Sequence, residues 1–402
     1  MIRTKDCLWI LFFWSISCYS NSDTGEQEIT FSGYVKSYLQ HQDSYDIAFL
    51  EFEENYTSQT AIRFMLDGIG KSLSWQVHYE LIPTFYSRTP VFNNRTFSLS
   101  TDIYRLTDIK QVLSDANSKH PVFENLDRLN VQIKLGAGDL TIGRQAITFG
   151  SARFVNPTDV FLPFDLRTFN QEYRAGIDAI RYQAPSGQMG EIDTGVIFGQ
   201  DARNENSAAY VNLRIHRLDS DIQVSLVRFS EQNLAGAGFE TTMGNAGFWF
   251  EAARVFAEKN YTRVSAGFDF SLTDKTFFML EYHYNQLSSG KPDSYLLLMN
   301  SPVYQKSGAF LLGKNYLLAS LSQIINPLWN LSASLTANLN DNSSYFSIKA
   351  QYNIAEDSYI DLGYYCFSGD SAEFMLTPPF FDPGSEFGAS PDLLFASVRH
   401  YF

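Results

Sequence analysis

The last eleven residues of the chain, Asp392 to Phe402, alternate between two kinds of side chain. One face is mostly apolar and carries Leu394, Ala396, Val398, His400 and Phe402. The other face carries Phe395, Ser397, Arg399 and Tyr401. Successive side chains of a β-strand point to opposite sides, so the pattern predicts a strand between an apolar surrounding and a polar interior. A soluble sheet can show this pattern once. Repetition of the pattern along the chain therefore distinguishes a barrel from a soluble sheet.

The alternation does recur, about every twenty residues, as expected of a β-barrel. In residues 330–339 every second residue is Leu or Ala, and the residues between them are Asn, Ser or Thr. A wholly polar face predicts a water-filled interior rather than a packed core. The predicted strands are 29–39, 59–67, 71–83, 126–136, 139–148, 175–184, 190–199, 207–216, 219–229, 233–241, 245–256, 261–272, 275–286, 313–323, 328–339, 343–354, 357–367 and 392–402.

The lengths of the connections test this assignment. With eighteen strands the short turns all fall at one end, and the long connections 84–125, 149–174, 287–312 and 368–391 fall at the other. We therefore predict an all-β fold: a transmembrane antiparallel β-barrel of 18 strands with a wet, polar lumen and long extracellular loops. A barrel of 16 strands is the alternative. Omitting the weakest strand, 233–241, would place the long segment 287–312 among the short turns.

The N-terminus predicts export. Arg3 and Lys5 precede the apolar run 8–14, and small residues follow up to Ser20, which is the pattern of a signal peptide. The run is too short for a spanning helix. Residues 1–20 are the predicted signal peptide and 21–402 a single barrel domain in the bacterial outer membrane. Cys18 as a lipid acceptor is the alternative at this end, although Ser15 departs from that motif.

Composition limits the other classes of function. The chain holds 30 basic and 44 acidic residues, a formal charge of -14, and we expect no nucleic-acid partner. No cysteine or histidine spacing is typical of zinc, so we expect no metal and no cofactor. The scattered histidines lack a partner motif for catalysis, so we expect no enzyme. A large soluble periplasmic protein would leave the aromatic terminus unexplained.

Residues 139–174 stand out on physical grounds. Alternation places Leu140 and Ile142 outward, and Arg144 would follow them into lipid unless a β-bulge at Gly143 resets the phase. We therefore predict that bulge. The segment 149–174 is long for a hairpin connection and rich in charge. It is predicted to fold into the lumen and narrow it, and an outer loop whose charges pair with one another is the alternative.

The same region carries a family resemblance. The sequence DLTIGRQAITFGSARFVNPTDVFLPF, residues 139–164, resembles the outer-membrane alginate-export family and related porin-like barrels. The matching residues are Gly143, Arg144, Gln145, Gly150, Arg153, Asn156, Pro157, Asp159 and Pro163. The resemblance covers about a fifth of the chain with its flanking segments. It implies an eighteen-stranded export or uptake channel, and it implies little about alginate itself.

Charged residues on the inward phase define the candidate solute path. Basic residues outnumber acidic ones there, and rings of Arg and Lys favour anions in pores. Ion pairs that hold a wide barrel open are the alternative role. The predicted lumen residues are Arg128, Lys134, Arg144, Arg153, Asp159, Arg167, Arg174, Arg181, Asp193 and Arg214. Phe402 is the predicted assembly signal.

Taken together, these features predict a passive outer-membrane channel for an anionic or sugar-like solute, of which an alginate-type uronate polymer is one candidate. A non-conducting adhesin or structural barrel is the alternative, and an outer-membrane enzyme fits less well. The expected partners are outer-membrane lipid, lipopolysaccharide, the barrel-assembly machinery that would read Phe402, and a small anionic or carbohydrate solute.

Overall fold

The structure, a computed structural model, describes residues 28–47, 50–88, 102–107, 118–161, 172–374, 381–382, 384–388 and 390–402. The predicted signal peptide and Arg167 lie outside these residues. No helix among the described residues is long and apolar enough to cross a membrane.

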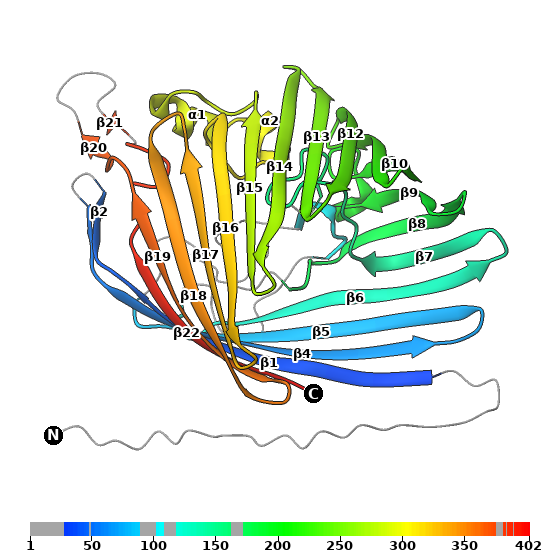
Figure 1. Cartoon of the computed structure of the whole chain (residues 1–402), viewed down its shortest axis with the longest axis horizontal. Coiled ribbons are helices and arrows are strands. Elements are labelled where there is room, and N and C mark those ends of the chain that lie inside the picture. Colours follow the sequence, from blue (N-terminus) through cyan, green and yellow to red (C-terminus); the bar gives the residue numbers. More distant parts are fainter. Residues whose placement is uncertain are drawn as a thin grey trace.

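Eighteen antiparallel strands form one closed sheet in which each strand pairs with its neighbours in the chain and the last pairs with the first (Figure 1). The wall strands are β1 (Glu28–Gln42), β4 (Asn55–Ile69), β5 (Leu73–Tyr86), β6 (Val122–Leu135), β7 (Gly138–Gln145), β8 (Ile177–Ser186), β9 (Gly190–Phe198), β10 (Ala208–Arg217), β11 (Ser220–Phe229), β12 (Gln232–Met243), β13 (Ala246–Phe256), β14 (Tyr261–Thr273), β15 (Thr276–Asn285), β16 (Asn315–Asn326), β17 (Trp329–Asn338), β18 (Ser343–Ala355), β19 (Ser358–Ser368) and β22 (Leu393–Tyr401). The predicted barrel of 18 strands is confirmed. The alternative of 16 is wrong, because the weakest predicted strand is β12.

The two ends of the barrel differ as predicted. At one end, which we call the turn end, eight connections of two or three residues join the strands. Leu218 and Asp219 there have φ of 53° and 56°, as in the turns that match the twist of a hairpin. The other end, the loop end, holds the long connections, although the links at 230–231, 257–260 and 339–342 are short.

Short strands and short helices lie in the connections at the loop end. The hairpin β2 (Tyr45–Ile47) and β3 (Leu50–Phe52) joins β1 to β4, and β20 (Glu373–Phe374) pairs with β21 (Phe381–Asp382). The connection from β15 to β16 contains η3 (Pro292–Ser294), α1 (Tyr295–Met299) and α2 (Pro302–Gln305), and η1 (Asp102–Tyr104) and η2 (Gln200–Ala202) lie in other connections.

The outer face of the wall is apolar, and its inner face carries both polar and aromatic side chains. Leu226 and Val398 point outward and are more than half exposed, as expected for side chains that contact lipid. On β1 the inward residues Tyr34, Lys36 and Tyr38 are buried. The interior is therefore not an open tube, because other side chains and connections cover these residues.

The last residue completes the closure. The backbone of Phe402 exchanges two hydrogen bonds with Gly33, of 2.8 Å and 3.0 Å, and its ring lies 6.0 Å from the ring of Phe31. A Cβ at Gly33 would come within 2.6 Å of the Phe402 ring and 2.3 Å of a backbone oxygen, so this position requires glycine. The terminal residue thus belongs to the seam between the first strand and the last.

Deleting Phe402 should impair assembly, because the seam then loses both hydrogen bonds and the ring contact. We expect less heat-modifiable barrel in the outer membrane, with export across the inner membrane unchanged, measured by gel shift on membrane fractions. Leu394→Ala, an outward substitution on the same strand, is the control. Normal barrel levels after the deletion would count against an assembly role for Phe402.

Candidate functional site

Residues 146–161, which follow β7, enter the barrel and are held there by two carboxylates. Glu251 on β13 and Glu281 on β15 are both fully buried and point inward. Glu251 accepts hydrogen bonds from the backbone N–H groups of Ser151 at 2.6 Å, Ala152 at 2.9 Å and Thr158 at 2.7 Å. The Thr158 hydroxyl adds a fourth bond of 2.7 Å.

Glu281 binds the next part of the same segment. It accepts the backbone N–H groups of Arg153 and Val155, each at 2.9 Å, and that of Phe154 at 3.2 Å. The indole of Trp249 donates a further bond of 2.9 Å. Hydrogen bonds to an ionised acceptor are about twice as strong as neutral ones. Two anions from the wall therefore fix the segment 146–161 inside the barrel, and the predicted inward fold is confirmed for these residues. We call 146–161 the inner loop.

Apolar packing holds the two ends of the inner loop. Ile147, Phe149, Val160 and Phe161 are buried against inward residues of β8–β14. The Phe149 ring lies 4.7 Å from that of Tyr210 on β10. The loop end of the barrel interior therefore contains a packed core, which the sequence pattern of a polar lumen did not predict.

The structure corrects the prediction of a β-bulge at Gly143. The register of β7 with both neighbours runs through Gly143 without a shift, so Arg144 stays in phase with Ile142, which is 44% exposed on the outer face. Gly143 is nonetheless required, since its φ is 116° and a Cβ would meet a backbone oxygen at 2.2 Å. Arg144 lies at the end of its strand rather than in the open lumen.

Arg144 is almost completely covered by polar partners. It forms an ion pair of 2.8 Å with Asp178, the residue opposite it on β8. It also donates to the carbonyl of Leu126 at 2.8 Å and to that of Thr107 at 3.1 Å. An outward arginine is therefore tolerated without a change of phase, because Asp178 neutralises it.

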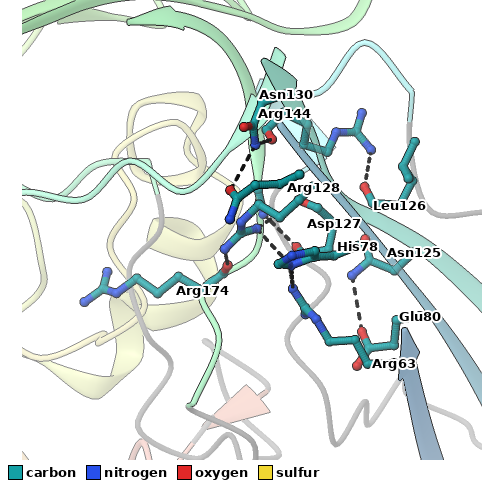
Figure 2. Close-up of polar contacts among 12 residues, drawn as sticks. Arg63, His78, Glu80, Asn125, Leu126, Asp127, Arg128, Asn130, Arg144 and Arg174 are labelled. Carbon is teal, nitrogen blue, oxygen red and sulfur yellow. Dashed lines mark hydrogen bonds and ion pairs between the residues drawn. The ribbon is translucent and has the colours of Figure 1, made fainter. Parts of the chain in front are cut away.

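The bulge occurs instead on β6, at Asp127. His78 on β5 faces Arg128, and the next residue, Tyr79, faces Leu126, which leaves Asp127 as the extra residue. Asp127 and Arg128 are consequently both buried, and Figure 2 shows them with Arg63 in one cluster. Strict alternation would put only one of two neighbours inside, and sequence reasoning therefore missed Asp127.

Asp127 is the centre of a buried ionic cluster. It is 1% exposed and accepts hydrogen bonds from Arg63, from Arg128 at 2.7 Å and from the backbone N–H of Gly176 at 2.8 Å. Arg105, from the connection between β5 and β6, approaches to 3.5 Å. One carboxylate thus ties two wall strands to two loop-end connections. The cluster neutralises charge that the sequence assigned to the solute path.

A hollow lies beside the inner loop, between β14, β15 and the connection that follows β15. It is lined by Arg153, Asp159, Arg174, Arg263, His283, Asn285 and residues 308–311, among others. Arg174 pairs with Asp159 at 2.5 Å, and Arg153 pairs with Glu240 at 2.8 Å. Arg263 is 3% exposed and donates to the carbonyl of Ser307 at 3.0 Å. Among the described residues, no carboxylate lies within ion-pair distance of Arg263.

The other predicted path residues lie elsewhere. Arg181 pairs with Asp193 at 2.6 Å, and the hydroxyl of Tyr210 donates to the same carboxylate at 2.9 Å. Lys134 and Arg214 are exposed near the turn end. The structure therefore brings together Arg153, Asp159 and Arg174 out of the predicted set, and Arg128 joins them by donating to the carbonyl of Arg174 at 2.7 Å. It separates these residues from the two exposed ones.

A second connection between loop and wall lies at the seam. Glu172, just before β8, contacts Lys36 on β1, accepts the Tyr401 hydroxyl at 2.5 Å and lies 3.4 Å from Arg399. Burial raises the pKa of Glu172, but the hydrogen bonds from Lys36 and Tyr401 lower it more, and the net pKa lies below its ordinary value. A depressed pKa in the folded state means that this contact stabilises at neutral pH and is lost only as the pH falls through that lowered value.

The strands and the inner loop define a closed, 18-stranded antiparallel β-barrel with part of one connection fixed inside it. Among solved structures, the chain is similar to Acinetobacter baumannii OccAB4, with a TM-score of 0.59 and 8% identity over 94% of this chain and 100% of that one. It is also similar to the outer membrane protein OprD from Pseudomonas aeruginosa, with a TM-score of 0.54 and 11% identity over 93% of each chain. At these identities the likeness shows the fold.

Comparisons of sequence add no closer relationship. No family model matches the chain, and no curated protein matches it. The 18-stranded barrel fold is therefore shown, whereas the alginate-export family remains a prediction that rests on residues 139–164.

Replacing both loop-binding carboxylates, Glu251→Gln and Glu281→Gln, should loosen the inner loop. Each substitution removes a charge from a set of charge-assisted hydrogen bonds, and we expect a loss of about 2 to 3 kcal/mol in loop attachment. Single-channel recordings should show larger current fluctuations from a barrel that still assembles. Glu240→Gln, which removes a bond to a side chain only, is the control. Equal noise in both variants would contradict the attachment.

Asp127→Asn should destabilise the barrel strongly. The substitution leaves buried arginines without their shared anion, and breaking a buried pair in this way costs about 3 to 5 kcal/mol. Heat-modifiability gels should show unfolding at a lower temperature. Asp201→Asn, which breaks an exposed pair with Arg203, should shift it little. An unchanged unfolding temperature for Asp127→Asn would show that the cluster does not hold the loops.

Proposed function

We propose that the protein is a passive outer-membrane channel for a small anionic or sugar-like solute, and that the inner loop forms its narrow part. The observation that carries the proposal is the attachment of this loop to Glu251 and Glu281 across the interior. A long connection that is fixed inside a barrel, rather than folded outside it, narrows any path through the lumen. The fold shared with OprD supports the outer-membrane location.

The charges beside the inner loop support an anionic solute. The oxygens of Glu251 and Glu281 accept hydrogen bonds from backbone N–H groups, and among the described residues neither carboxylate forms an ion pair with the arginines nearby. Arg153, Arg174 and Arg263 border the hollow. Arg153 lies 2.8 Å from Glu240 and 3.9 Å from Asp269, and Arg174 lies 2.5 Å from Asp159, whereas Arg263 has no such carboxylate among the described residues. Guanidinium groups bind carboxylates and phosphates with two parallel hydrogen bonds. A path narrowed in this way fits a monomer or short oligomer of a uronate better than a long polymer.

Planar-bilayer recordings with reversal potentials test the proposal. We expect chloride to permeate better than potassium at about 0.1 M salt, where the Debye length is ~10 Å, and the preference to fade at about 1 M, where it is ~3 Å. Arg263→Gln should reduce the anion preference with little change in conductance. Arg217→Gln, on an outward position of β10, is the control. Cation preference at low salt, or no conductance, would overturn the proposal.

A further inference from the structure

The outer face of β10–β13 is mostly apolar, and its charged residues are all arginines. Outward positions on these four strands carry Leu, Val, Ile, Phe, Ala and a few small or neutral polar residues, with no acidic residue among them. The charged outward residues are Arg217, Arg228 and Arg254. Arg217 lies next to the turn end, and the other two lie toward the loop end. Two cations therefore share the loop-end half of an otherwise apolar surface.

Of these two arginines, Arg228 has fewer polar contacts. It lies on β11, two residues before the link 230–231, opposite Asn233 on β12 and Ala209 on β10. It is exposed, and within the described part of the chain its side chain makes no hydrogen bond or ion pair. Arg254 lies two strands away and donates to Thr262 at 2.8 Å and to Gln286 at 3.3 Å. An arginine that faces hydrocarbon is destabilising, less so near the headgroups, where an anion can pair with it.

A hollow in the outer wall adjoins Arg228. It has a volume of about 650 Å³ and lies over β8–β13. Its lining includes the small outward residues Ala209 and Ala235 and the larger side chains of Val196, Val211, Leu226 and Phe256. Arg228 and Asn233 close the loop end of the same hollow. The surface thus combines an apolar depression with a cation at one end.

We propose that this hollow is a binding site for one lipid of the outer leaflet, the lipid A part of lipopolysaccharide. An acyl chain would occupy the hollow, and a phosphate would pair with Arg228, with Arg254 as the second donor. Guanidinium groups suit phosphate because they present paired donors in a fixed plane. The arginines lie at the loop end, which we place outside the cell, where the phosphates of lipid A are found. The site rests on the proposed outer-membrane location but not on conduction, so a barrel that does not conduct could still bind this lipid.

Native mass spectrometry of the full-length protein in detergent tests the site. The probes are diphosphoryl lipid A, lipid A from which both phosphates have been removed, and phosphatidylglycerol. We expect bound diphosphoryl lipid A to survive dilution, and removal of its phosphates to weaken binding. Arg228→Gln should weaken it about fivefold and Arg228→Gln with Arg254→Gln further, the factor expected for each cation at a membrane surface.

The matched control is Arg217→Gln, an outward arginine at the opposite end of the same surface. It should bind lipid A as the unaltered protein does, and all variants should show the same heat-modifiability. Three results would overturn the proposal: equal binding of phosphorylated and dephosphorylated lipid A, equal loss in Arg217→Gln, or displacement of lipid A by phosphatidylglycerol at equal concentration. The last result would identify a general site for acidic lipids instead.

Discussion

The backbone N–H and C=O groups along both edges of every strand need hydrogen-bond partners, and this constraint underlies the whole structure. An open sheet leaves two edges of unpaired N–H and C=O groups, whereas closure between β1 and β22 leaves none. Once the sheet is closed, alternation assigns every side chain to lipid or to the interior. The interior then has to accommodate each inward charge, and the position of the inner loop follows from how it does so.

The buried carboxylates of the interior find their partners in two ways. Asp127 is surrounded by guanidinium groups, whereas Glu251 and Glu281 are satisfied by backbone N–H groups of the inner loop. In the first case the cost of burying a carboxylate is offset by cations that no longer attract a solute. In the second case the carboxylates position a loop and leave the neighbouring arginines at the hollow. The net charge of the chain therefore says little about the charge along the path.

Much of the fold could be predicted because the signal is local. Period-2 alternation marks each strand, and the order of short and long connections fixes their number, as β12 shows. The site depends on contacts between residues far apart in the chain. Nothing near Arg144 indicates that Asp178 will neutralise it, so the sequence favoured a bulge that the register does not contain. Likewise, the sequence alone assigns Glu251 to the lumen as a free charge. The structure shows that it binds the backbone of residues 151–158.

The seam between Tyr34 and Tyr401 joins the first strand of the barrel to the last. Neighbouring hairpins can form as soon as their residues are available, but this pairing requires the whole chain and has the largest loop-closure entropy of any in the sheet. Glu172, Lys36 and Arg399 meet at the same seam. We therefore expect the seam to form last in folding, with the inner loop already inside when the wall closes around it.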